Sequence, residues 1–255
     1  MKLSKTLLLL IISIVFACKN EKADESASVS KEEVVSDPSA KIIPITHGTL
    51  VIENEDEIIY IDPVGGLEAF KGQKPPTLVL ITDIHGDHLS NSTLEALNLS
   101  DVTIIAPKAV TDKISSTTSK TIVTLNNNDS YKHNTINIEA IPMYNLRKEA
   151  LKYHTKGRGN GYVLTINDQR IYISGDTEDI PEMRSLKNID KAFVCMNLPY
   201  TMTVDSAASA VLDFKPQHVY PYHYRGTEGL SDIERFKKLV NDGDSSIKVV
   251  LLDWY

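Results

Sequence analysis

Apolar residues recur along the chain in short blocks that turn and polar residues separate. Three β-rich runs lie at residues 42–45, 50–53 and 58–61, and a continuous apolar run follows at residues 78–81. A strand with one solvated face alternates apolar and polar residues, whereas an uninterrupted apolar run indicates burial on both faces. We therefore expect residues 78–81 to form a central strand of a sheet.

The rest of the chain combines further strands with helices. A helix is predicted from Ser90 to Leu97, with Ser90 or Asn91 as its N-cap, and other helices over 204–214, 232–240 and from Lys108 onward. Further strands are predicted at residues 102–106, 121–125, 136–141, 162–166, 170–174, 192–196, 219–220 and 248–252. Two strand-rich halves that each carry helices predict an α+β fold, in which two sheets pack together with helices outside.

The first 40 residues differ in composition from the rest. Lys2 and Lys5 precede an apolar run over residues 7–17, as in a secretory signal peptide. A membrane-spanning helix would need about 20 apolar residues, more than this run contains, so a signal peptide is favoured over a transmembrane anchor. Residues 19–40 are rich in Ser, Glu, Asp and Lys and lack aromatics, which predicts a flexible tether. Residues 41–255 are enough for one domain with a sizeable core.

The apolar run ends in Val15-Phe16-Ala17-Cys18, which resembles a bacterial lipobox. The resemblance implies that residues 1–17 are removed and that Cys18 is acylated. The protein would then be a membrane-anchored lipoprotein of the bacterial cell envelope, facing the periplasm or the surface. The alternative is an ordinary secretory signal in which Cys18 is incidental. With Cys18 lipidated, Cys195 is the only thiol left, and its apolar neighbours predict a packed core residue.

Imidazole and carboxylate side chains are concentrated directly after the predicted central strand, in the segment Thr82-Asp83-Ile84-His85-Gly86-Asp87-His88. Such ligands so close together suit divalent metals. Alternation along an extended chain turns Asp83 and His85 the same way, so Asp87 and His88 can face a neighbouring site. The alternative is a solvated surface loop. The net charge of −7 argues against a nucleic-acid partner. The partner that we expect is a small-molecule substrate.

This segment resembles the His-x-His-x-Asp-His signature of the metallo-β-lactamase superfamily, with Asp83 in the first His position. Three further motifs of the superfamily are matched, in Thr46–Gly48 with Ile59–Pro63, in Arg170–Thr177 and in Tyr220–Tyr224. The resemblance covers roughly residues 42–253 and implies a four-layer αββα sandwich, the metallo-β-lactamase fold. Within the superfamily, the chain is most similar to the branch containing ascorbate-6-phosphate lactonase, and N-acyl-phosphatidylethanolamine phospholipase D is a more distant relative.

The resemblance also implies two divalent metal ions and the residues that hold them. The second site would consist of Asp87, His88, Asp176 and His223, with Asp176 bridging to the first. The first site would consist of Asp83, His85, Asp176 and one further ligand, either His154 or Asn145. True β-lactamases usually carry a metal-ligating histidine near the position of Asn145. Asn145 offers only a weak carbonyl oxygen, whereas His154 could fold back and supply an imidazole, so we favour His154 for this role. Its alternative is a surface histidine.

Asp83 bears on the identity of the metal. An oxygen ligand in place of nitrogen makes the first site harder and shifts its preference toward manganese or iron. Three carboxylates and one hydroxide also offset the charge of two divalent ions, whereas a histidine at position 83 would leave an excess positive charge. Zinc is the default expectation, with manganese or iron as alternatives, and a single filled site is a further alternative.

The expected reaction is hydrolysis of an ester, a lactone or a phosphodiester by a metal-activated hydroxide. Asp87 is the expected catalytic residue, which orients the hydroxide and accepts its proton. Tyr200 or Tyr224 would donate a hydrogen bond to the developing oxyanion, or else serve as a packing residue.

Candidate substrate-binding residues lie in and around a basic cluster at residues 147–158. Lys156 and Arg158 of this cluster would attract an anionic substrate, and the alternative is a solvated loop. Asn145 would contribute an amide next to the metals, and His47 would line the pocket or hold the opening hairpin.

Two other functions fit the same motifs. One is a non-catalytic binding or scaffold lipoprotein on this fold, because Asp83 replaces a histidine and no histidine directly follows residue 141. The other is a di-iron oxidoreductase, which redox-linked iron would reveal. Hydrolysis of β-lactams is disfavoured because the region of the third ligand departs from the β-lactamase pattern.

Overall fold

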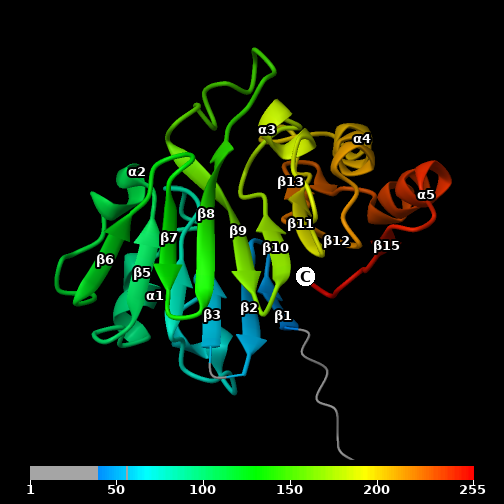
Figure 1. The fold of residues 1–255 in the computed structure, drawn as a ribbon. Coiled ribbons are helices and arrows are strands. Elements are labelled where there is room, and N and C mark those ends of the chain that lie inside the picture. The colour runs from blue at the N-terminus through cyan, green and yellow to red at the C-terminus, as the bar shows by residue number, and fades with distance from the viewer. Residues whose placement is uncertain (1–39, 56) are drawn as a thin grey trace, which may run out of the picture. The chain divides into compact units, whose positions relative to one another are not determined.

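The computed structural model describes residues 40–55 and 57–255, whose arrangement Figure 1 shows. The predicted signal peptide, Cys18 and residues 19–39 of the predicted tether lie outside the described residues and stay predictions. Ala40, predicted as the last residue of the tether, is buried in the core. Among the helices of the described part, none is long and apolar enough to cross a membrane.

The first sheet contains the N-terminal strands. Its six strands lie in the order β1 (Lys41–Thr46), β2 (Thr49–Asn54), β3 (Glu57–Ile61), β4 (Leu78–Leu80), β5 (Thr103–Ala106) and β6 (Thr121–Thr124). The strands β1, β2 and β3 pair antiparallel, whereas β3 to β6 pair parallel. Parallel neighbours need crossover connections, which here carry the first helices.

The second sheet has seven strands in the order β15 (Lys248–Val249), β12 (His218–Tyr222), β11 (Lys191–Cys195), β10 (Gln169–Ile173), β9 (Gly159–Ile166), β8 (Ile136–Met143) and β7 (Ser130–His133). The strands β10, β11 and β12 are parallel, and β8 runs in the same direction because two antiparallel pairings relate it to β10. A separate hairpin of β13 (Arg225–Gly226) and β14 (Gly229–Leu230) follows β12.

Helices accompany each sheet (Figure 1). They are η1 (Leu67–Phe70), α1 (Asn91–Ala96) and α2 (Lys108–Thr111) in the first half, and α3 (Pro181–Arg184), α4 (Val204–Phe214) and α5 (Ile233–Gly243) in the second. The side chains of Ser90, Thr203 and Asp232 accept N-cap hydrogen bonds for α1, α4 and α5. Ser90, rather than Asn91, is therefore the cap of α1.

Alternating residues of the first sheet face two different cores. Leu80 and Ile105 belong to the core between the sheets, whereas Val79 and Ile104 face the core under η1, α1 and α2. The inter-sheet core continues through the second sheet to residues of α4 and α5, such as Phe236. The layers are therefore helices, sheet, sheet and helices, which confirms the predicted fold class and a central strand buried on both faces.

Four short features were absent from the sequence prediction: the one-turn helix η1, the strand β7, the one-turn helix α3 and the β13–β14 hairpin. Each is too short to show a hydrophobic period, so tertiary contacts decide its conformation. In α3, for example, the fully buried side chain of Met183 belongs to the core that reaches α4 and α5.

The two sheets bring the ends of several strands to one edge of the molecule. Asp62 follows β3, the Asp83–His88 segment follows β4, Asp176 follows β10 and His223 follows β12. Because β3 and β4 are parallel, as are β8, β10 and β12, the ends of strands within each sheet point the same way. Ligand-bearing loops collect at such an edge, and here they form the candidate site.

Candidate metal centre

The loop after β4 supplies more of the predicted ligands than any other described segment. Its backbone turns sharply, since both His88 and Leu89 donate backbone hydrogen bonds to the carbonyl of His85, at 3.0 and 2.8 Å. The side chains of Asp83 and His88 point inward and are fully buried, whereas His85 and Asp87 remain part-exposed. The turn therefore directs its side chains toward two neighbouring ligand groups.

The first ligand group consists of Asp83, His85 and His154, whose ligand atoms lie within 4.8 Å of one another. His85 Nδ1 lies 2.6 Å from Asp83 Oδ2, and His154 Nε2 lies 3.2 Å from Asp176 Oδ2. His154 is 1% exposed, so it is not the surface histidine of the alternative interpretation. The loop between β8 and β9 folds back and brings His154 to Asp83, far along the sequence.

The second ligand group consists of His88, Asp176 and His223, again with ligand atoms within 4.8 Å. Asp176 Oδ1 lies 3.4 Å from His223 Nε2, and Asp176 Oδ2 lies 3.5 Å from His88 Nε2. Asp87 Oδ2 lies 3.4 Å from His223 Nε2 on the exposed side of this group. Asp176 thus contacts members of both groups, as expected of a bridging carboxylate.

Several ligand atoms of both groups are buried without a hydrogen-bond partner among the described residues. They are His88 Nε2, His154 Nε2, His223 Nε2 and Asp176 Oδ1. Leaving buried polar atoms unpaired costs about 1–3 kcal/mol each, so a cluster of them calls for a ligand. Imidazole nitrogens and carboxylate oxygens at these spacings fit divalent cations of the zinc, manganese or iron type.

The electrostatics of the group favour ionised carboxylates. Burial by itself raises the pKa of Asp176, but the imidazoles of His223 and His88 outweigh it and hold the pKa well below its ordinary value. Burial likewise opposes ionisation of Asp87, yet the neighbouring imidazoles of His223 and His47 lower its pKa. Burial lowers the pKa of His88, while Asp176 and Asp62 raise it well above the ordinary value. The acids are therefore charged at neutral pH, as metal ligation requires.

Asp62 holds His88 in place, a role the sequence analysis did not assign. Its Oδ2 lies 2.8 Å from His88 Nδ1, and it accepts hydrogen bonds from Thr82 Oγ1 at 2.6 Å and from Thr82 N at 2.7 Å. A carboxylate behind a metal-ligating histidine fixes its tautomer and leaves Nε2 free for the metal. The signal was present, because Asp62 directly follows β3 in a motif already matched to the opening hairpin.

Arg158 is paired with Asp83 rather than directed toward the cavity. Its Nε and Nη2 lie 3.2 and 3.1 Å from the two carboxylate oxygens of Asp83. Asp83 therefore brings its own counter-charge to the site. The superfamily signature has a neutral histidine at position 83, and the carboxylate of Asp83 adds one negative charge there. The guanidinium of Arg158 offsets that negative charge.

We expect Arg158→Met to destabilise the metal-free protein by about 3 kcal/mol, because it leaves the buried carboxylate of Asp83 without its cation. Excess zinc should reduce the difference in stability between Arg158→Met and the wild type, since a metal ion at Asp83 replaces the lost positive charge. Thermal unfolding with chelator and with zinc measures both effects. The matched control is Arg235→Met, whose ion pair with Asp205 is exposed and should matter little. An equal difference in both conditions would contradict the prediction.

Gly48 gives His223 the space that it occupies. A Cβ at position 48 would lie 2.8 Å from His223 Cδ2 and 3.6 Å from His88 Cε1. We expect Gly48→Ala to displace His223 and weaken the second site by roughly tenfold or more, the scale of changes behind metal ligands. Titration with zinc against a competing chelator measures this. Gly86→Ala is the control, because a Cβ at position 86 meets no atom within 4 Å; equal affinities for both variants would refute the idea.

The predicted substrate-binding residues Asn145 and Lys156 have partners within the protein. Asn145 Nδ2 donates to the carbonyls of Ala150 and Tyr200, at 2.9 and 2.7 Å, while its Oδ1 is buried without a partner. Lys156 Nζ lies 2.8 Å from Glu182 Oε1. Asn145 thus shapes the loop that carries His154, and Lys156 is already neutralised by an acid.

A cavity of about 370 Å³ opens onto the ligand groups. It is lined by His85, Asp87, Tyr153, His154, Asp176, Asn197 and Tyr200. The four residues predicted to bind substrate, His47, Asn145, Lys156 and Arg158, are not among those that line it. Larger hollows elsewhere in the described part, such as the one bordered by Lys187 and Lys215, contain no candidate metal group.

Comparison with known proteins shows the family of the chain. Residues 58–224 match the family described as the β-lactamase superfamily domain. The chain belongs to the metallo-β-lactamase superfamily. Within it, a metal-dependent hydrolase of Pyrococcus horikoshii is 31% identical over 213 residues, which cover 79% of this chain and 92% of that protein.

Solved structures of the superfamily resemble the whole described fold. A crystal structure of a protein from Parabacteroides distasonis, described as a metal-dependent hydrolase, is 38% identical, with a TM-score of 0.76 and coverage of 85% of this chain and 94% of that one. Igni18, a metallo hydrolase of Ignicoccus hospitalis, is 21% identical with a TM-score of 0.71, covers 84% and 95%, and shows the fold alone. This chain is accordingly a metal-dependent hydrolase of the superfamily, as predicted.

Proposed function

We propose that the protein hydrolyses a small ester, lactone or phosphodiester that carries a negative charge, and that it does so with two divalent metal ions. The observation that carries this proposal is the cavity of about 370 Å³, because both ligand groups reach its lining, the first through His85 and His154 and the second through Asp176. Asp87 lines the cavity beside them. Sites for small molecules are concave and close over a few well-placed polar groups. The similarity of the sequence motifs to the branch containing ascorbate-6-phosphate lactonase further supports an ester or lactone.

Two side chains in the cavity wall can donate to a substrate. Tyr200 Oη accepts a hydrogen bond from Thr227 Oγ1 at 3.1 Å, so its own hydrogen is available to the cavity. Asn197 Oδ1 accepts from the hydroxyl of Thr201, which leaves the Nδ2 hydrogens for a bound molecule. Donors placed where negative charge develops stabilise the transition state of acyl or phosphoryl transfer.

Asp87 is the residue best placed to orient the attacking water. Its carboxylate lines the cavity and is 42% exposed, unlike the buried Asp83 and Asp176. With its pKa lowered it is ionised, and it can accept a hydrogen bond from the water. Metal ions, when bound, would supply hydroxide near neutral pH and polarise the scissile bond.

The preference for an anionic substrate rests on Lys152. Arg147, Lys156 and Arg158 of the basic cluster pair with Glu178, Glu182 and Asp83. Lys152 forms no ion pair with any described residue, and its Nζ lies 4.9 Å from the ring centroid of Tyr153, a wall of the cavity. Its charge is therefore available at the rim, where it raises the local concentration of anions.

The test begins with the full chain purified without chelator, whose bound metals are counted by plasma mass spectrometry. The same protein is assayed against an aryl ester, a γ-lactone and an aryl phosphodiester, each with and without a carboxylate. We expect near two equivalents of zinc, manganese or iron and hydrolysis of one class, faster for the anionic member. Asp87→Ala should lower both metal content and rate, while the exposed Asp242→Asn should change neither.

Other outcomes would replace the proposal. Absence of metal after incubation with zinc or manganese would favour the non-catalytic binding lipoprotein. Bound iron with a redox-dependent spectrum and no hydrolysis would favour the oxidoreductase. Faster hydrolysis of neutral substrates, or an unchanged preference in Lys152→Met, would remove the anionic part of the proposal alone.

We also propose that Cys18 is acylated after removal of residues 1–17 and anchors the protein to a membrane of the bacterial envelope. The lipobox-like sequence and the polar segment after it support this. Labelling with an alkyne fatty acid should mark the wild type, and Cys18→Ser should be unlabelled and leave the membrane fraction. Label retained in Cys18→Ser would contradict the anchor.

A further inference from the structure

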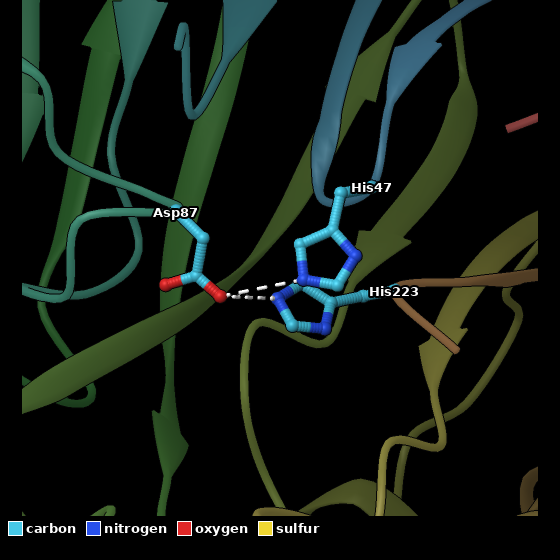
Figure 2. A group of neighbouring side chains, drawn as sticks. All are labelled: His47, Asp87 and His223. Atoms are coloured by element: carbon cyan, nitrogen blue, oxygen red, sulfur yellow. Dashed lines mark ion pairs between the residues drawn. The ribbon is translucent and has the colours of Figure 1, made fainter. Parts of the chain in front are cut away.

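The turn between β1 and β2 places His47 beside the second ligand group (Figure 2). His47 Nε2 lies 3.3 Å from Asp87 Oδ2, and the ring centroids of His47 and His223 are 3.8 Å apart. His47, Asp87 and His223 are thus close enough to form a third candidate metal group. Whether His47 binds metal depends on which ring nitrogen carries hydrogen, because a ligand nitrogen needs a free lone pair.

The hydroxyl of Tyr255 determines which ring nitrogen of His47 carries hydrogen. Its oxygen accepts backbone hydrogen bonds from Tyr224 N and Arg225 N, both at 3.1 Å, and lies 2.7 Å from His47 Nδ1. A hydroxyl offers one hydrogen and two lone pairs. Since the two amides occupy both lone pairs, the hydrogen of Tyr255 must point to His47 Nδ1.

Tyr255 retains that hydrogen over the physiological range, because the ordinary pKa of a phenol is already about 10, and desolvation raises the pKa of Tyr255 further. His47 Nδ1 is therefore an acceptor, and the hydrogen of the neutral imidazole sits on Nε2. The Nε2 atom that carries this hydrogen lies 3.3 Å from Asp87 Oδ2, a carboxylate oxygen that can only accept.

We infer that His47 is a positioning residue and not a metal ligand: its Nε2–H holds Asp87 in place, and the hydroxyl of Tyr255 fixes the tautomer that makes this possible. The inference rests on the proposed metal centre, in which Asp87 orients the attacking water. The second ligand group does not need His47, because His88, Asp176 and His223 already form a group without it. A residue more than 200 positions away in sequence thus acts on Asp87 through one histidine.

The direct test reads the tautomer of His47 by nitrogen NMR of the full chain labelled in its histidine rings, first metal-free and then loaded with zinc. The signals of His47 are assigned by their absence in His47→Gln. We expect Nδ1 without hydrogen and Nε2 with hydrogen in both states. Tyr255→Phe should shift His47 to a mixture of tautomers, whereas Tyr131→Phe, a tyrosine on β7, should not. A hydrogen on Nδ1, or an Nε2 that loses its hydrogen on zinc loading, would overturn the inference.

Metal counting and kinetics supply independent readings. His47→Gln, which keeps a donor near Nε2, and His47→Leu, which does not, should both bind as much zinc as the wild type. With a substrate from the screen, His47→Leu should lose about tenfold in kcat with KM unchanged, and His47→Gln should recover part of it. Loss of one zinc equivalent in both variants would make His47 a ligand. Failure of the wild type to bind zinc would instead count against the metal centre itself, so the two failures are distinguishable.

Discussion

Asp176→Asn should reduce bound metal from near two equivalents to below one and lower hydrolysis by about 10³-fold. This carboxylate is the only described residue whose two oxygens contact members of both ligand groups, His154 and His88 through Oδ2 and His223 through Oδ1. Asparagine keeps the shape but loses the charge, so neither group retains a shared anionic ligand. A 10³-fold loss corresponds to about 4 kcal/mol of transition-state stabilisation.

The measurement is metal content by plasma mass spectrometry together with kcat/KM on a substrate from the screen. Asp179→Asn is the matched control, since this acid lies close by in sequence but pairs with Arg184 at 2.6 Å. It should keep its metals and most of its activity. Two equivalents of metal in Asp176→Asn would refute a bridging role.

Asp62→Ala should weaken metal binding by about 10–100-fold and also lower the free energy of unfolding by about 3–5 kcal/mol. Both effects follow from one network, because Asp62 is fully buried and accepts from Thr82 and His88. Its removal leaves those donors unpaired in the core and frees the ring of His88 to turn.

Asp62→Asn separates the two effects. Asn tolerates the left-handed backbone of this position, where φ is 47°, and keeps one side-chain oxygen as acceptor. We expect it to recover part of the stability but little of the metal affinity, because it lacks the charge that orients His88. Urea unfolding in chelator and competitive zinc titration measure the two quantities. Equal recovery of both would show that Asp62 acts by packing alone.

Much of the fold could be predicted from the sequence because its signals are local. The apolar run at Leu78–Ile81 indicated a doubly buried strand, and the structure confirms it with residues alternating between two cores. The helix at Val204–Phe214 was predicted with the bounds that are observed, since its apolar stripe and its N-cap lie within the same stretch of chain. Short features such as α3 lack that local information and depend on their neighbours in space.

The sequence by itself determined the kind of chemistry at the site: a dense group of histidines and aspartates after a central strand, with further aspartate and histidine ligands at later strand ends. It could not determine which distant residues complete them. His154 reaches Asp83 only because the β8–β9 loop folds back, Arg158 neutralises Asp83 instead of meeting a substrate, and Tyr255 orients His47. Such pairings depend on loop paths and side-chain directions that only the packed sheets define, and no local period of hydrophobicity encodes them.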